Sequence, residues 1–261
     1  MVMPRPLLIH PVEGLPEFAP GMSIAAEIVR ALDGCEQLSG LCDGDVLVVT
    51  SKIVSKVEDR FLPASEKAAA IAAETVRVVA KLPGSGASAI VENRLGLVMA
   101  AAGIDESNVA GERLLLLPED PDRSAARIAE ELEGLTGRIV GVVVSDTAGR
   151  AWRIGQTDMA IGAARVQMID DVRGGVDANG KPLVVTQRCV GDEMAAAADL
   201  VKGKASNLPV AVIRGLSQHV GVRFVEGARS IVRAPEEDLF RMGANEAIAE
   251  GERRARAVRD V

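Results

Sequence analysis

The stretch Ile139–Gly162, IVGVVVSDTAGRAWRIGQTDMAIG, decides the fold class of this 261-residue chain. It opens with a short valine-rich run over 139–144, and this run ends in Ser145, Asp146 and Thr147. Strands that are covered on both faces are typically short β-branched runs that end in small or polar residues. The stretch therefore predicts a buried strand that carries a carboxylate and a hydroxyl at its carboxyl end.

Similar strand patterns alternate with helical ones along the rest of the chain. Strong strand candidates are Val46–Thr50 and Pro209–Arg214, and weaker ones are Leu183–Thr186 and Leu114–Leu117. Helical spacing occurs over Ser23–Leu32, Glu66–Lys81, Asp122–Leu135, Asp192–Lys202 and in a tail from about 236. This alternation predicts a mixed α/β fold. No linker is visible, since Gly84–Ala87 reads only as a loop, so we expect one domain over 1–261.

Composition excludes several classes of function. Aromatic residues make up only 2% of the chain and the formal net charge is -7. A nucleic-acid partner is therefore excluded, because it would need a basic face and aromatic stacking surfaces. The three cysteines have no paired spacing, which argues against a disulfide framework. No apolar run reaches the roughly 18–20 residues of a membrane helix, so we expect a cytoplasmic protein without a membrane partner.

The polar residues after the 139–144 run are the first candidate site. Asp146 is a hard oxygen ligand, and the Thr147 hydroxyl can complete a Mg²⁺ or Mn²⁺ shell beside phosphate oxygens. Arg150 and Arg153 follow, and guanidinium groups suit phosphates or substrate carboxylates. The alternative is that Asp146 caps the next turn and Thr147 binds backbone. Trp152, the only tryptophan, reads as a packing anchor.

Two further clusters carry polar side chains of the same kind. Asp105 and Asn108 follow an apolar run. Asp105 is a candidate second carboxylate for the same ion, and Asn108 is a candidate contact to a nucleotide. The alternative is that this segment is only a turn. Lys52 and Lys56 lie four residues apart after the first strong strand, so on a helix they share one face. They can neutralise phosphates or form a solvated helix face. His10 and His219 lack a nucleophile pattern, which disfavours a histidine-based triad.

In order along the chain, these segments resemble the coenzyme F420-0:L-glutamate ligase (γ-glutamyl ligase) family. The segments that carry the resemblance are GLPEFAPG at Gly14–Gly21, DGDVLVVTSKIVSK at Asp43–Lys56, VENRLGLVMAAAGIDESNV at Val91–Val109, LLLLPEDPDRSAARI, SDTAGRAWRIGQTDMAIG, LVKGK and PVAVIRG. The sequence of these segments is most similar to the N-terminal domain of the bacterial bifunctional form, in which a flavin-binding domain follows. A separate flavin-binding partner domain is therefore an expectation of the resemblance.

The resemblance implies a GTP-dependent ligase with two Mg²⁺ or Mn²⁺ sites, and it allows for K⁺. Such an enzyme adds L-glutamate to the carboxylate of F420-0 through γ-linked amide bonds, once or several times, by way of an acyl phosphate. It also implies an unusual two-lobed fold in an intertwined homodimer, with the site near the subunit contacts. Two alternatives stay open: an NTP-dependent amide ligase with another carboxylate acceptor, and a non-catalytic F420 or nucleotide-binding module.

Residue by residue, the resemblance assigns roles to matching positions. Asp105 and Asp146 match ligands of the first metal, and Thr147 matches a position at the second metal. The nucleotide-contacting positions are Leu15, Pro16, Glu17, Phe18, Ser51, Lys52, Lys56, Asn108, Lys202, Gly203 and Lys204. Arg150 and Arg153 are the candidate catalytic contacts to phosphate or substrate.

The chain departs from archaeal-type members at three positions. Leu95 and Ala101 replace a histidine and an asparagine, and Ala148 replaces a phenylalanine. These departures affect the expected substrate contacts and leave the expected metal and nucleotide chemistry unchanged.

Overall fold

The structure of this protein is a computed structural model that describes residues 6–81, 89–106 and 111–259. The chain divides into two compact units: unit 1 comprises Met1–Arg60 and Leu117–Ile231, and unit 2 comprises Phe61–Leu116 and Val232–Val261. Both contain helices and sheets, so the predicted mixed α/β class is confirmed. No helix among the described residues is long and apolar enough to cross a membrane.

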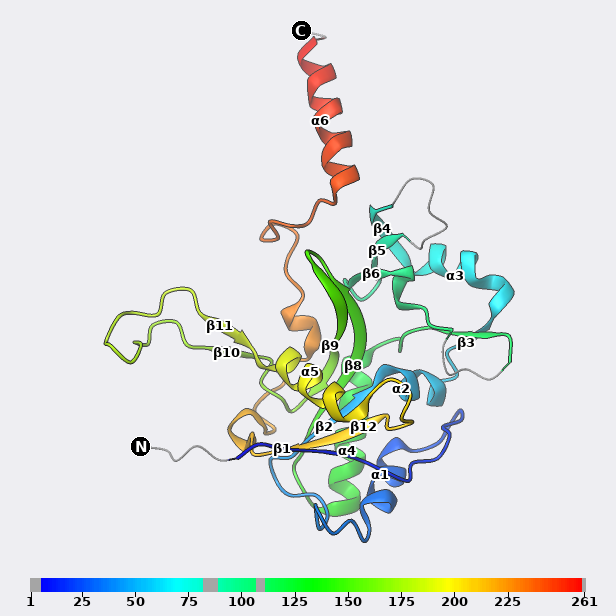
Figure 1. Cartoon of the computed structure of the whole chain (residues 1–261), viewed down its shortest axis with the longest axis vertical. Coiled ribbons are helices and arrows are strands. Elements are labelled where there is room, and N and C mark those ends of the chain that lie inside the picture. Colours follow the sequence, from blue (N-terminus) through cyan, green and yellow to red (C-terminus); the bar gives the residue numbers. More distant parts are fainter. Residues whose placement is uncertain (1–5, 82–88, 107–110, 260–261) are drawn as a thin grey trace. The chain divides into compact units, whose positions relative to one another are not determined.

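A five-stranded mixed sheet forms the centre of unit 1 (Figure 1). Its order is β1 (Leu8–Pro11), β12 (Val210–Arg214), β2 (Val46–Thr50), β8 (Gly141–Arg150) and β9 (Arg153–Ala164). The β2 and β8 strands run parallel, and every other neighbouring pair is antiparallel. The three strong strand predictions thus become the three central strands, where both faces are covered.

Helices cover both faces of this sheet (Figure 1). The apolar residues Val46, Val48 and Ile213 form one core cluster with α5 (Val190–Lys202). Because successive strand residues point to opposite faces, Leu47 and Val49 face the other side. There α4 (Pro121–Thr136) packs on β8 and β9, and α1 (Ile24–Leu32) packs on α4. A seven-residue helix, α2 (Ser51–Val57), follows β2 directly.

Local sequence signals set the helix starts in unit 1. The Ser23 side chain accepts a hydrogen bond from the backbone N–H of Ala26, so it is the N-cap that the sequence predicts for α1. Asp120 caps α4 in the same way and Pro121 occupies the first turn. The predicted helix over Asp192–Lys202 begins two residues earlier, at Val190.

The remaining short elements of unit 1 correct one prediction. The strands β10 (Ile169–Asp171) and β11 (Gln187–Cys189) form an antiparallel pair, and η3 (Ser217–His219) and η4 (Ala228–Ile231) are short 3₁₀ helices. The strand predicted over Leu183–Thr186 is therefore wrong in position. Val184 and Val185 are exposed, because their segment lies in the loop that joins β10 to β11.

Unit 2 is built from small sheets and two longer helices. Its elements are β3 (Phe61–Pro63), η1 (Ala64–Glu66), α3 (Lys67–Glu74), β4 (Thr75–Ala80), β5 (Ile90–Asn93), β6 (Val98–Ala100), η2 (Ala101–Gly103), β7 (Arg113–Leu115) and α6 (Ala244–Arg259). The β3 and β7 strands pair antiparallel, as do β4, β5 and β6 in that order. The weak strand prediction over Leu114–Leu117 thus corresponds to β7.

Two helix predictions in unit 2 need correction. The helix predicted over Glu66–Lys81 ends at Glu74, and β4 occupies the second half. The run Thr75–Val79 is rich in β-branched residues, which favour strands when a neighbouring strand is available. The tail helix begins at Ala244 rather than near 236. The predicted loop Gly84–Ala87 lies outside the described residues.

Candidate active site

The ends of β2 and β8 place the first candidate residues together in unit 1. The two strands are parallel and Thr50 aligns with Ser145, so the residues that follow lie at the same edge of the sheet. There the Ser51 hydroxyl donates a hydrogen bond of 2.7 Å to Asp146 Oδ1. The carboxyl ends of parallel strands are where α/β sheets commonly bind ligands. The structure thus brings two residues that the resemblance singled out separately, Ser51 and Asp146, into direct contact.

The strands β8 and β9 form a long hairpin that brings Asp158 to the same edge. Thr147 on β8 pairs with Asp158 on β9, and the hairpin turns at Ala151 and Trp152. Only 4% of the Asp158 side chain is exposed. A buried carboxylate requires hydrogen-bonded or charged partners, so its surroundings define the site.

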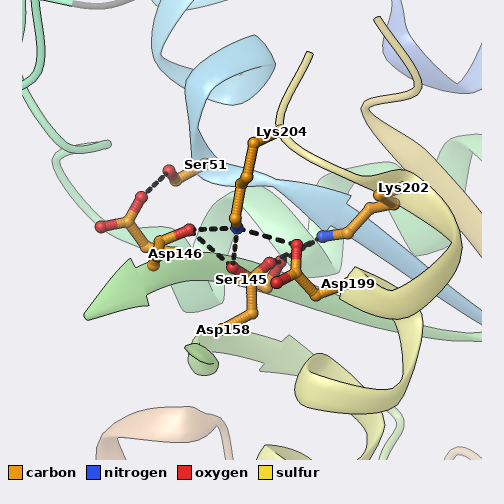
Figure 2. A network of polar contacts seen from close by, with 8 residues as sticks. Ser51, Ser145, Asp146, Asp158, Asp199, Lys202 and Lys204 are labelled. Carbon is orange, nitrogen blue, oxygen red and sulfur yellow. Dashed lines mark hydrogen bonds and ion pairs between the residues drawn. The ribbon is translucent and has the colours of Figure 1, made fainter. Parts of the chain in front are cut away.

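Four donors surround the Asp158 carboxylate in a paired arrangement (Figure 2). Its Oδ2 atom accepts from Ser145 Oγ at 2.9 Å and from Lys202 Nζ at 2.9 Å. Its Oδ1 atom accepts from Thr147 Oγ1 at 2.6 Å and from Lys204 Nζ at 2.8 Å. Each oxygen thus meets one hydroxyl and one ammonium.

The two lysines also bind the hydroxyls that share their carboxylate oxygen. Lys202 Nζ lies 2.8 Å from Ser145 Oγ, and Lys204 Nζ lies 2.6 Å from Thr147 Oγ1. Lys204 also donates to Asp199 Oδ1 at 2.8 Å. The lysines differ in access to solvent, since 4% of the Lys202 side chain is exposed and 57% of that of Lys204.

The charges of this network shift the ionisation of its members. Burial favours a raised pKa for Asp158, but the Lys202 charge and the hydrogen bonds from Lys204, Thr147 and Lys202 outweigh it and hold the pKa below its ordinary value. For Lys204, burial favours a lowered pKa, but the bonds to Asp158 and Asp199 raise it. The carboxylate is therefore ionised and the exposed lysine is a cation at neutral pH.

Gly203 allows two neighbouring lysines to reach one carboxylate. Lys202 is the last residue of α5, and Gly203 follows it with φ 61° and ψ 177°. This region of backbone space is nearly restricted to glycine. The turn sends Lys202 into the core and returns Lys204 to the other oxygen of Asp158, which explains how two lysines so close in sequence both reach this carboxylate.

The predicted nucleotide segments near the N-terminus also come together. The ammonium of Lys56, a buried residue of α2, forms an ion pair with the carboxylate of Glu17. In the same segment, Leu15 and Pro16 are half-buried and Phe18 is buried. Lys52 lies on α2 and is half-buried. The alternative of a solvated helix face is therefore wrong for Lys56, which holds the Leu15–Phe18 segment.

The hairpin tip carries the predicted catalytic arginines. Arg150 and Arg153 pair across the turn and both are exposed. Between them, 91% of Trp152 is exposed, so the prediction that it is a packing anchor is wrong. Its backbone has φ 66°, and the two-residue turn carries the indole away from the core of unit 1.

The metal ligands expected from the resemblance have different surroundings. Asp146 and Thr147 are successive strand residues on opposite faces of β8: Asp146 meets Ser51, and Thr147 meets Asp158. Asp105 belongs to unit 2, where its backbone bridges to Leu115. Asn108 lies outside the described residues.

The side chains at these positions fit a hard divalent cation by type. Carboxylate and hydroxyl oxygens are the ligands that Mg²⁺ and Mn²⁺ prefer. Among the described residues, no three Asp, Glu, His or Cys side chains lie close enough together to hold a metal ion. Asp146 and Thr147 each present one oxygen atom of the right type, and a metal ion bound there would need further ligands, such as phosphate oxygens.

The three departures from archaeal-type members fall in both units. Ala148 is buried in β8, one residue after Thr147. Leu95 and Ala101 belong to unit 2, where Ala101 is buried and has φ 51°. A small side chain at 148 thus stands next to the network of Figure 2.

Sequence reasoning assigned no role to Asp158, Ser145 or Asp199. The spacing of the quoted stretch does not reveal Asp158. A regular two-residue turn after Arg150 would place Gln156 opposite Thr147, and the register shift between Gly149 and Arg150 brings Asp158 there instead. Alternation along the strands then puts Ser145, Thr147 and Asp158 on one face. The polar run at 156–158 hid this strand, because buried strands are rarely polar there.

Comparison with known proteins gives a consistent result. Residues 14–215 match the family described as F420-0:Gamma-glutamyl ligase. The chain is 37% identical to the coenzyme F420:L-glutamate ligase of Methanopyrus kandleri over 255 residues, which cover 90% of this chain and 98% of the relative. It is 38% identical to the protein of that name from Methanothermobacter thermautotrophicus over 247 residues, covering 88% of this chain and 97% of the relative. The relative of that name in Natronomonas pharaonis is 36% identical over 254 residues, 88% of this chain and 93% of its own length.

Proposed function

We propose, from the premise that this chain belongs to the F420-0:gamma-glutamyl ligase family, that it joins L-glutamate to coenzyme F420-0 with GTP as the energy source. The chain is an amide-bond-forming ligase, and its curated relatives are named for glutamate ligation to coenzyme F420. The observation that best supports GTP as the phosphate donor is the ammonium of Lys204, on a largely exposed side chain, beside a buried ionised network at the carboxyl ends of β2 and β8.

Amide synthesis from a carboxylate requires activation, because a carboxylate anion resists attack by an amine. In the first step an oxygen of the F420-0 carboxylate bonds to the γ-phosphorus of GTP, the bond from that phosphorus to the bridging oxygen breaks, and GDP leaves. The product is an acyl phosphate. In the second step the glutamate nitrogen bonds to the acyl carbon, inorganic phosphate leaves with the electrons of the broken C–O bond, and the nitrogen loses a proton.

The residues of this chain would bind and orient the phosphates. Lys204 offers a charged donor to a phosphate oxygen, and Thr147 lies next to it. Charged donors that are already in place where negative charge develops stabilise a phosphoryl-transfer transition state. Arg150 and Arg153 at the exposed hairpin tip would bind a substrate carboxylate through two parallel hydrogen bonds each. The Leu15–Phe18 segment, held by Lys56, would lie along the nucleotide.

From the resemblance alone, Asp105 in unit 2 and Asp146 in unit 1 are each proposed as ligands of a divalent cation, and Thr147 would contribute to a second one. When bound, Mg²⁺ or Mn²⁺ offsets the charge of the phosphates, and K⁺ would add to this effect. The opposite orientation of Asp146 and Thr147 on β8 supports two separate cations rather than one shared ion.

The decisive experiment is incubation of the full chain with F420-0, glutamate, GTP and Mn²⁺ or Mg²⁺, with mass detection of the products. We expect F420-0 to gain the mass of one or more glutamate residues while GDP and phosphate form. Asp146→Asn and Asp105→Asn should abolish this product while the thermal unfolding curve stays intact. Asp171→Asn, at an exposed ion pair with Arg173, is the matched control and should keep full activity.

Three outcomes would redirect the assignment. A glutamate adduct only with another carboxylate would favour the alternative acceptor. Bound GTP without phosphate release in the complete mixture would favour a non-catalytic binding module. Full activity in either aspartate variant would contradict the metal assignment. Repeating the assay with and without K⁺ tests the monovalent ion.

We also infer from the resemblance that the chain forms an intertwined homodimer with its sites near the subunit contacts. Sedimentation at several protein concentrations would measure the mass in solution. A mass equal to one chain at assay concentration, with full activity, would contradict this inference. A separate flavin-binding partner belongs to the same expectation, and added flavin should leave glutamate ligation unchanged if that partner acts in another step.

A further inference from the structure

The two lysines on Asp158 have different freedom to move. Lys202 is buried and its ammonium bonds to Ser145 and Asp158. Removing it would leave the ionised Asp158 carboxylate buried beside a single, largely exposed cation. A buried charge without its partner is strongly unfavourable. Lys202 is therefore fixed in place by the charge that it neutralises.

Lys204 can leave without that penalty. Lys202 and the two hydroxyls would still bind the Asp158 carboxylate, so no unpaired charge would remain buried. Asp199, the other carboxylate bonded to Lys204, is partly exposed, with 20% of its side chain accessible, so water can replace the lost hydrogen bond. A lysine side chain is flexible and its ammonium can change partners. The ammonium is thus available to an incoming anion that offers more negative charge than the shared carboxylate.

We propose that Asp158 is a positioning residue of this site: it keeps Lys202 as its permanent counter-ion and holds Lys204 beside Thr147 until a phosphate of the nucleotide binds the Lys204 ammonium. Lys202 then has no contact with the nucleotide, although it lies only two residues before Lys204, which binds it. This inference rests on the proposed function, because GTP supplies the phosphate. It deepens that function by naming which lysine binds and which residue orients it.

A purely structural role for Asp158 is the competing explanation. The same unit contains such a pair, since the buried Asp45 is bonded to Arg214. The two explanations differ in one measurable respect. If Asp158 acts through Lys204, the two residues must show coupled effects on nucleotide affinity, whereas a structural residue affects affinity independently of Lys204.

The experiment is calorimetric titration of the full chain with GTP, once with Mn²⁺ and once with EDTA, together with KM and kcat for GTP. We expect Lys204→Met and Asp158→Asn each to weaken GTP binding by about tenfold or more, as expected for a lost charge-assisted hydrogen bond. The double variant Asp158→Asn/Lys204→Met should bind no more weakly than Lys204→Met alone. The loss should appear in KM more than in kcat.

Asp158→Asn leaves Lys202 without its counter-ion, so a second variant keeps the test valid if it unfolds. Asp158→Asn/Lys202→Met removes both buried charges and should regain most of the melting temperature. It should still bind GTP as weakly as Asp158→Asn. Asp45→Asn, which breaks the structural pair, and Lys181→Met, at an exposed lysine, are the matched controls. Both should keep the GTP affinity of the unsubstituted chain wherever they are folded.

The inference would be overturned if the loss of GTP affinity in Asp158→Asn/Lys204→Met equalled the product of the losses in the two single variants. Unchanged GTP affinity in the folded Asp158→Asn/Lys202→Met variant would overturn it as well. Binding requires no acceptor, which separates this result from the proposed function. If the unsubstituted chain binds GTP but forms no glutamate amide, the proposed function fails and the coupling still decides the role of Asp158. If it binds no GTP, both fail.

Discussion

Asp45 and Asp158 are two buried carboxylates at opposite ends of the same sheet, and they are neutralised in different ways. Asp45 precedes β2 and accepts two hydrogen bonds from Arg214, at 2.9 and 2.7 Å, and one from the backbone of Cys42. Arg214 also donates to the carbonyl oxygens of Leu38 and Gly40. A single planar guanidinium thus ties several parts of unit 1 together.

Asp158, by contrast, divides its charge between two separate lysines and two hydroxyls. A planar guanidinium fixes its partner in two parallel bonds, whereas ammonium groups on flexible stems can exchange partners. The hydrogen bonds to Asp45 raise the pKa of Arg214, so the guanidinium stays charged. We therefore expect the Asp45 end of the sheet to maintain the fold and the Asp158 end to bind ligand.

The largest expected effect separates the two carboxylates directly. Asp45→Asn leaves Arg214 without its buried partner and should reduce the free energy of unfolding by about 3 kcal/mol or more. GTP affinity should not change in the folded fraction. Urea unfolding measures the first quantity and calorimetry the second. A fall in GTP affinity with Asp45→Asn would break the distinction between the two ends.

Two glycines sharpen the comparison with a smaller effect. At Gly44, where φ is +86°, an added Cβ would lie 2.4 Å from Ser217 Cβ, so Gly44→Ala should destabilise unit 1 by about 3 kcal/mol and spare affinity. At Gly203 an added Cβ would meet only the side chain of Ser206, whose Oγ would lie 2.8 Å away. Gly203→Ala should lose about 2 kcal/mol, mainly from backbone strain, and raise the KM for GTP. Equal KM effects in both variants would contradict the comparison.

A pH effect of intermediate size should come from the Asp45 end. His219 follows β12, and burial lowers its pKa. Below the ordinary histidine pKa of about 6.5, the unfolded chain therefore binds more protons at this residue than the folded chain does. The contribution of neutral His219 to the free energy of unfolding is present above that pKa and is lost as pH falls through it. Its slope cannot exceed about 1.4 kcal/mol per pH unit. His219→Gln should flatten the pH dependence of urea unfolding below pH 7; an unchanged slope would contradict this prediction.

The smallest expected effect is at the tip of the β8–β9 hairpin, which bonds to neither Asp45 nor Asp158. Because Trp152 is exposed, Trp152→Ala should change the free energy of unfolding by no more than about 0.5 kcal/mol. Thermal melting of the variant measures this change. A larger loss would mean that the indole is buried in solution against a surface such as a second copy of the chain.

The parts of unit 1 that local sequence determines could be predicted. β2, β8 and β12 follow from their β-branched runs, and α1 follows from Ser23 and the helical spacing after it. β9 could not be predicted in this way, because its polar residues belong in a strand only when β8 lies beside them. The same reason applies to β4, where pairing with β5 overrode helical spacing.

The candidate site divides in the same way, into residues that the sequence could single out and contacts between them that it could not. The resemblance singled out Ser51, Asp146 and Lys202–Lys204 as separate segments, but the contact between Ser51 and Asp146 depends on the register of two parallel strands. Asp158 required both the hairpin register and the turn at Gly203. Long-range pairing decides such contacts, and no local pattern specifies it.

The exposed position of Trp152 gives the protein an optical reporter of its own. The chain contains one tryptophan and no tyrosine, so excitation near the indole band reads a single residue. That residue lies between Arg150 and Arg153, the two side chains proposed to bind substrate. Its emission in the free protein should be that of a water-exposed indole. A ligand that reaches the tip would change the intensity or the wavelength of that emission without any added label.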